Sequence, residues 1–250
     1  MSDYTTNATM ERLAERIDGA GHLVVLTHRK PDGDAIGSAL ALHRALAPGK
    51  RVDIHLVGPV NRSLIELAGD TPIVISDEPP VEEPELVVLV DTGSWVQVGP
   101  LSDWLRRQRD AGRVIGLDHH PVGDDTATER IVDTAAASCT VLVHRLLQSM
   151  GCTIDGDRGG TGEAIFAGLA TDTGWFQHSN ADAAAYALAS GLLQLGVDRI
   201  RLHRVLEQNA SPGKLLLLGR ALASIRWELD GRCAVMRLTA ADFAAAGTGR

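Results

Sequence analysis

The stretch ELVVLVDTG, residues 85–93, places five consecutive apolar side chains before an aspartate, a threonine and a glycine. A continuous apolar run of this length, ended by turn-forming residues, is typical of a strand buried on both faces of a parallel sheet. Similar runs rich in valine and isoleucine occur at residues 22–28, 52–58, 72–76 and 113–120. The first half of the chain therefore predicts a parallel β-sheet.

Helical patterns separate these runs and continue after them. Between the predicted strands they lie at residues 35–47, 61–69 and 101–111. The alternation favours an α/β fold with a doubly wound, mainly parallel sheet. After residue 134 the expected helices are 138–150, 160–171, 181–195, 197–208 and 212–227.

A last predicted strand, CAVMRLT (233–239), follows a turn-forming Asp-Gly pair. A single strand cannot pair its backbone alone. We therefore expect one α/β domain over residues 1–195 and a helical linker over 196–228. Residues 229–250 would begin a second, truncated α/β domain whose remainder is missing.

Composition narrows the classes of partner and compartment. The chain has 250 residues and a net charge of −8, with 32 acidic and 24 basic side chains, which disfavours binding to duplex DNA. No signal peptide is visible, and the apolar segment KLLLLGRALASI is too short to span a bilayer. Three widely spaced cysteines indicate reduced thiols rather than a disulfide framework. We expect a soluble cytoplasmic protein with no membrane partner.

Four segments combine carboxylates with imidazoles. They are THRKPDGDAIGS with His28, Asp32 and Asp34, VVLVDTGS with Asp91, GLDHHPVGD with Asp118, His119 and His120, and GLATDTGWFQHSN with Asp172. Ligands of open parallel sheets bind beyond the carboxyl ends of the strands, where three of these segments lie. Several carboxylates share one site while ionised only if cations neutralise them. Carboxylates with imidazoles suit Mn²⁺, Mg²⁺ or similar ions.

Each segment by itself also has a simpler interpretation. The PDGD stretch is a turn signal whose aspartate caps the next helix, Asp91-Thr-Gly ends a strand, and Asp172 caps a helix. Two adjacent histidines after an aspartate are harder to explain in this way. Trp95 and Trp175 lie near these loops, where they would stack on a base or make ordinary apolar contacts. Taken together, the four segments predict one metal site.

With these motifs in place, the chain resembles the DHH/DHHA1 phosphoesterase superfamily. The likeness rests on THRKPDGDAIGSALAL, LVVLVDTGS, GLDHHP and GLATDTGWFQHSN. Within the superfamily, the chain is similar to the nanoRNase / phosphoadenosine-phosphate (pAp) phosphatase group. The resemblance implies a DHH catalytic domain followed by the start of a substrate-binding DHHA1 domain. It also implies two Mn²⁺ ions per site, with Mg²⁺ or Co²⁺ as alternatives.

The resemblance further implies two overlapping ligand sets that share a bridging carboxylate. One set comprises His28, Asp32 and Asp91, and the other comprises Asp34, Asp91, His119 and Asp172. His120 would bind the substrate phosphate, and Asp118 would orient its neighbours. Asp91, Asp118 and His120 are therefore the expected catalytic residues.

The implied reaction is hydrolysis of phosphodiester or phosphomonoester bonds. Expected substrates are short single-stranded oligoribonucleotides, linear dinucleotides and pAp, and relatives suggest a homodimer. The chain departs from the family in lacking a basic residue in SWVQVG and the glycine-rich, histidine-containing motif of DHHA1. The alternative is a nucleotide-binding module that is inactive or weakly active because the C-terminal domain is missing.

Overall fold

A six-stranded parallel sheet forms the centre of the first of two units into which the chain divides. In the computed structural model, which describes residues 4–247, the units comprise Met1–Leu202 and His203–Arg250. The domain limits expected after residues 195 and 228 stay predictions. The three cysteines are free, as expected.

The strand order confirms the predicted doubly wound fold. All neighbouring strands are parallel, in the order β3-β2-β1-β4-β5-β6. The strands are β1 (His22–Leu26), β2 (Arg51–Leu56), β3 (Ile73–Ile75), β4 (Leu86–Val90), β5 (Val114–Asp118) and β6 (Glu129–Val132). The chain builds outward from β1 in one direction and then returns to add β4 on its other side. This reversal places the topological switch point, where such sheets bind ligands, between β1 and β4.

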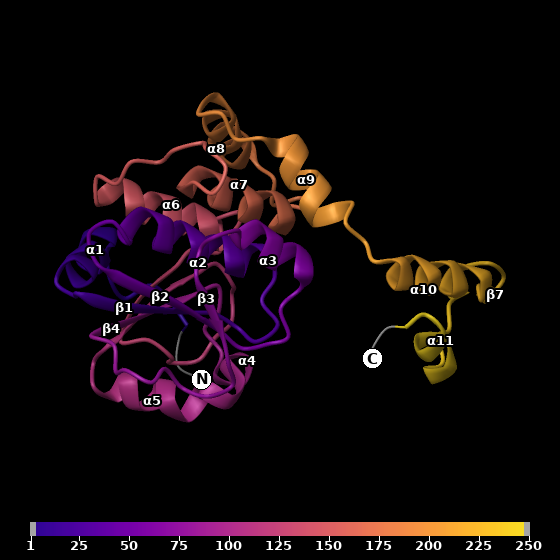
Figure 1. Cartoon of the computed structure of the whole chain (residues 1–250), viewed down its shortest axis with the longest axis horizontal. Coiled ribbons are helices and arrows are strands. Elements are labelled where there is room, and N and C mark those ends of the chain that lie inside the picture. Colours follow the sequence, from indigo (N-terminus) through magenta and orange to yellow (C-terminus); the bar gives the residue numbers. More distant parts are fainter. Residues whose placement is uncertain (1–3, 248–250) are drawn as a thin grey trace. The chain divides into compact units, whose positions relative to one another are not determined.

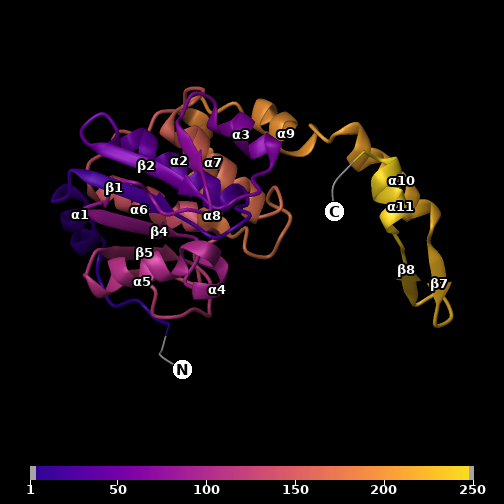
Figure 2. The same cartoon turned by 60° about the horizontal axis from the view of Figure 1, so that its bottom comes forward.

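Helices cover both faces of the sheet (Figure 1). One face carries α1 (Met10–Asp18), α2 (Gly33–Leu46), α6 (Cys139–Ser149) and α7 (Thr161–Asp172). The other face carries α4 (Trp95–Val98), η1 (Gly99–Leu101) and α5 (Ser102–Asp110). Three further helices are α3 (Arg62–Ala68), α8 (Ala183–Gln194) and α9 (Arg199–Glu207). Figure 2 shows the same layers from a view turned by 60°.

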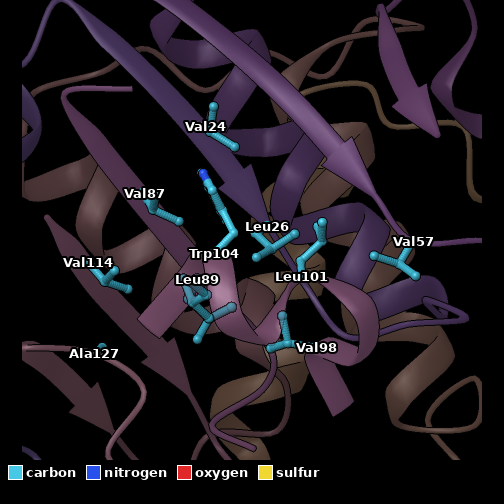
Figure 3. Packing of buried hydrophobic residues seen from close by; sticks show 11 residues of the cluster. Val24, Leu26, Val57, Val87, Leu89, Val98, Leu101, Trp104, Val114 and Ala127 are labelled. Atoms are coloured by element: carbon cyan, nitrogen blue, oxygen red, sulfur yellow. The ribbon is translucent and has the colours of Figure 1, made fainter. Parts of the chain in front are cut away.

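An apolar cluster fixes the second helical layer against the sheet (Figure 3). Leu101 and Trp104 are at most 2% exposed and pack on side chains of the central strands. The strand residues in this cluster are Val24, Leu26, Val87, Leu89 and Val114. Because these strands are buried on both faces, their sequences are continuously apolar rather than alternating.

Several elements of the first unit were not predicted, among them the short helices α4 and η1, the helix α1 and the strand β6. The helix α1 buries Leu13, Ala14 and Ile17, and the side chain of Thr9 caps it by accepting from the N–H of Arg12. The strand β6 pairs with β5 and forms one edge of the sheet. In the described part of the chain, no helix is long and apolar enough to cross a membrane.

The second unit corrects the expected helix 212–227 and the expected strand 233–239. The helix α10 (Pro212–Ala223) ends earlier than expected, and β7 (Arg226–Glu228) pairs antiparallel with β8 (Cys233–Val235). A turn with positive φ at Leu229, Asp230 and Gly231 joins the two strands. Such turns favour a tight hairpin over continuation of the helix. The last element is α11 (Ala240–Ala245).

Candidate metal centre

The predicted site residues meet at the carboxyl end of the sheet, although they come from distant parts of the sequence. His28 follows β1, Asp91 follows β4, and Asp118 ends β5, with the two histidines directly after it. Asp32 and Asp34 lie at the start of α2, and Asp172 lies at the end of α7.

Asp91 lies at the centre of this group and is only 2% exposed. Its backbone has a positive φ of 58°, a strained conformation for a residue other than glycine, and its N–H donates to the carbonyl of Leu117 at 3.0 Å. The two carboxylate oxygens face different histidines. Oδ2 lies 3.6 Å from His28 Nε2, and Oδ1 lies 3.5 Å from His119 Nε2.

The first cluster consists of His28, Asp32 and Asp91, whose ligand-type atoms lie within 4.8 Å of one another. The Nδ1 atom of His28 is 3.0 Å from the carbonyl oxygen of Arg29, which leaves Nε2 directed at the two carboxylates. Asp32 also caps α2, because its Oδ1 accepts from two backbone N–H groups at 3.0 Å each. Asp32 therefore caps the helix and belongs to the first cluster at the same time.

The second cluster consists of Asp34, His119 and Asp172, again within 4.8 Å. The Nδ1 atom of His119 lies 3.3 Å from a backbone carbonyl oxygen, so its Nε2 faces the carboxylates. Asp34 is buried and accepts from the N–H groups of Cys139 at 2.5 Å and Thr140 at 3.0 Å, at the start of α6. The sequence analysis did not identify this contact, because it joins residues more than a hundred positions apart.

A left-handed turn orients Asp172. This residue is the last of α7, and Thr173 rather than Asp172 is the C-cap, so the simpler interpretation of Asp172 as a helix cap is wrong. Positive φ angles at residues 174–176 then reverse the chain. Asn180 thereby returns to the site, and its Nδ2 donates to Asp172 Oδ2 at 3.3 Å. Asn180 was not predicted to have a role, because the turn that returns it has no simple sequence signal.

Asp118 and His120 form a hydrogen-bonded pair beside the two clusters. Asp118 is 1% exposed, and its Oδ1 accepts from His120 Nδ1 at 2.8 Å. The same oxygen accepts from the backbone N–H groups of His119 and His120 at 2.8 and 3.2 Å. Because Nδ1 of His120 is engaged and its side chain is 51% exposed, the ring can present Nε2 to a ligand. His120 also forms a third cluster with Asp91 and His119, whose ligand-type atoms lie within 4.8 Å of one another.

The pKa values reflect the crowding of carboxylates. Burial raises the pKa of Asp34 well above its usual value, and nearby Asp91 raises it further. Burial disfavours the imidazolium form of His28, but Asp32 and Asp91 outweigh this effect and raise its pKa to about 10. The pKa of His119 is raised to about 9 for the same reason, by Asp91 and Asp34 against the effect of burial. A divalent cation would relieve the crowding and displace these protons.

The residues fit divalent cations. Within residues 4–247, the buried atoms Asp91 Oδ1 and His119 Nε2 have no hydrogen-bond partner, which is rare for buried polar atoms. The nitrogen–oxygen separations in the clusters are 3.5–3.9 Å. Two atoms about 2.1 Å from one ion are roughly 3.0–3.6 Å apart, so small movements would bring these atoms into coordination.

The two tryptophans near the site have different surroundings. Trp95 packs against the apolar cluster, in agreement with the simpler interpretation. The guanidinium of Arg106 lies 4.0 Å from the centre of its ring in a cation–π contact. Trp175 belongs to the left-handed turn after Asp172. Its stacking on a base stays a prediction.

Comparison with known proteins identifies the family. A family model described as "DHH family, N-terminal domain" matches residues 22–169. The chain belongs to the DHH family. It is 30% identical over 216 residues to the Thermus thermophilus protein named "Bifunctional oligoribonuclease and PAP phosphatase NrnA", which covers 84% of this chain and 61% of that protein.

A second relative is the "Probable bifunctional oligoribonuclease and PAP phosphatase NrnA" of Streptococcus mutans. It is 25% identical over 188 residues, or 74% of this chain and 56% of that protein. The chain thus spans about three-fifths of the length of these curated relatives.

Two solved structures share the fold. An exopolyphosphatase-related protein from Bacteroides fragilis matches with a TM-score of 0.86 and 26% identity, over 96% of this chain and 72% of that chain. A putative family II inorganic pyrophosphatase from Methanococcus jannaschii matches with a TM-score of 0.55 and 19% identity, over 84% of this chain and 68% of that chain.

Proposed function

We propose that this member of the DHH family is a two-metal phosphoesterase with Mn²⁺ as its cofactor and Mg²⁺ or Co²⁺ as alternatives. Its proposed substrates are short oligoribonucleotides, linear dinucleotides and pAp. The names of the Thermus and Streptococcus relatives support this substrate class. The acidic net charge of −8 also suits short substrates better than long duplexes.

The arrangement of Asp91 is the observation that carries the proposal. Its two oxygens face histidines that belong to two different clusters. A carboxylate placed in this way can bridge two cations, whereas a single-ion site would need only one of the clusters. The proposed ligands of one ion are His28, Asp32 and Asp91, and those of the other are Asp34, Asp91, His119 and Asp172. When bound, the pair of ions would activate water and neutralise charge on the attacked phosphate.

His120 is the proposed proton donor. The hydrogen bond to Asp118 raises the pKa of His120 above its usual value, which stabilises the imidazolium form. Because one proton is held on Nδ1 by Asp118, the other is carried on Nε2. From there it can stabilise a phosphoryl oxygen or protonate the leaving group. His120→Gln should accordingly lower turnover far more than metal occupancy, and an equal loss of both would contradict this role.

Release of mononucleotide from a 5′-phosphorylated RNA dinucleotide tests the function, with pAp assayed in parallel. We expect release that requires Mn²⁺ and is abolished in Asp91→Ala. Equilibrium binding of the same dinucleotide should be measured on the same preparation. Binding without release, in protein that holds two ions, would instead favour the nucleotide-binding module. The absence of both binding and release would reject both functions.

A further inference from the structure

The segment before α1 is fixed to the edge of the sheet next to the metal centre. The N–H of Asn7 donates to the carbonyl of Arg130 at 3.1 Å, and its Oδ1 accepts from the N–H of Arg130 at 2.7 Å. The hydroxyl of Thr6 donates to the carbonyl of Val132 and accepts from its N–H, both at 2.8 Å. The segment therefore covers the edge strand β6 and holds Tyr4 near the carboxyl end of β5.

The ring of Tyr4 occupies a slot made by two glycines in site loops. A Cβ atom at Gly93, in the loop after β4, would lie 2.0 Å from the Tyr4 hydroxyl oxygen. A Cβ atom at Gly123, in the loop after β5, would lie 2.6 Å from the ring. Any larger residue at either position would displace the ring. The guanidinium of Arg130 lies 5.4 Å from the centre of the ring.

The Tyr4 hydroxyl completes the hydrogen bonding of Asp118. It donates to Asp118 Oδ2 at 2.6 Å. The other oxygen, Oδ1, already accepts from the ring of His120 and from two backbone N–H groups. The buried carboxylate is thus held from both sides, and the hydroxyl opposes rotation of Oδ1 away from His120.

We infer that Tyr4 is a positioning residue, which acts through Asp118 to fix the ring of His120 toward the substrate. The inference rests on the proposed function, because it takes His120 to be the group that meets the phosphate. Tyr4 does not touch the reacting atoms itself. Carboxylates and carbonyls that orient imidazoles in metal sites commonly change activity 10- to 100-fold when removed, and Tyr4 stands one step further out.

Tyr4→Phe is the decisive variant, because it removes the hydroxyl and leaves the ring in its slot. We expect kcat to fall about 10-fold, with KM changed less than about twofold and two ions still bound. Tyr186→Phe, in α8, is the matched control, since it removes the same hydroxyl from a tyrosine that donates to the carbonyl of Phe176 at 3.2 Å and not to Asp118. Its kcat should stay at the wild-type value.

A double-mutant cycle separates positioning from a general loss of structure. Tyr4→Phe should cause no further loss of kcat in a His120→Gln background, because the group through which it acts has gone. An equal 10-fold loss in both backgrounds would overturn the inference. So would an unchanged kcat in the single variant.

A readout without catalysis distinguishes failure of this inference from failure of the proposed function. Nitrogen chemical shifts of the His120 ring report the protonation of each ring nitrogen, and they can be measured both without metal and with Mg²⁺. Tyr4→Phe should reduce the population protonated on Nδ1, and Tyr186→Phe should leave it unchanged. If the wild type proves inactive, this shift alone decides. An unaltered ring in Tyr4→Phe would refute the positioning role.

Discussion

Replacing Gly37 by alanine should separate the two helices that carry two of the proposed metal ligands. The backbones of α2 and α7 touch at this residue. A Cβ atom at Gly37 would lie 2.6 Å from the carbonyl oxygen of Ala164 and 3.0 Å from the nitrogen of Gly168. Carbon–oxygen contacts relax near about 3.3 Å, so one helix must move by about 0.7 Å. The obstruction is backbone, which cannot rotate away as a side chain can.

The expected change in stability follows from two opposed terms. Overpacking of this kind costs about 1–3 kcal/mol, and the upper half of that range applies because backbone atoms must move. Alanine in place of glycine within a helix returns about 1 kcal/mol. The free energy of unfolding should therefore fall by about 1–2 kcal/mol. Gly191→Ala, in α8, is the matched control, because its Cβ would meet no described atom within 4 Å. It should raise the free energy of unfolding by about 0.5–1 kcal/mol.

The affinity for Mn²⁺ should also fall in Gly37→Ala. Asp34 lies at the start of α2 and Asp172 at the end of α7. Metal–ligand distances tolerate deviations of only about 0.2 Å, so a shift of the helices should weaken Mn²⁺ binding at least roughly 10-fold. Urea unfolding with a chelator and calorimetric Mn²⁺ titration measure the two effects. The close packing of α2 on α7 would be refuted if Gly37→Ala gained stability as Gly191→Ala does and bound Mn²⁺ as the wild type does.

Two further predictions concern buried polar groups. In the presence of a chelator, Asp34→Ala should lower the free energy of unfolding by about 1–2 kcal/mol more than Asp34→Asn does. The reason is that alanine leaves the buried N–H groups of Cys139 and Thr140 without an acceptor. Equal stability of the two variants in urea unfolding would argue against this contact. Burial lowers the pKa of His55, which is only 4% exposed, so the unfolded chain, with a pKa of about 6.5, takes up the proton first. The contribution of His55 to stability is therefore present above about pH 6.5 and lost below it. The fall in Tm between about pH 7.5 and 5.5 should be smaller in His55→Gln than in the wild type. Parallel curves of Tm against pH for the two proteins would contradict this.

The central strands and the position of the site could be predicted because one physical constraint governs both. A strand buried on both faces must be apolar throughout, so Asp91 and Asp118 are conspicuous where their strands end. Parallel strands bring those ends to the same edge of the sheet. The sequence pattern was therefore enough to group the clusters, although it could not divide the ligands between two ions.

Other features depend on contacts that have no local signal. The helix α1 buries only three apolar side chains, and β6 is four residues long, so neither has a long enough period to stand out. Tyr4 meets Asp118 across 114 residues of sequence, and no pattern around Tyr4 indicates its partner. The role of Asn180 depends on a left-handed turn in which Trp175 adopts a backbone conformation that its residue type does not favour.

The number of Mn²⁺ ions bound per chain, measured by elemental analysis after equilibrium dialysis, tests the dinuclear centre most directly. Wild-type protein should bind two ions, and Asp91→Ala should bind neither tightly, because Asp91 faces both clusters. One ion in the wild type, or two retained in Asp91→Ala, would contradict the assignment of Asp91 as the bridge.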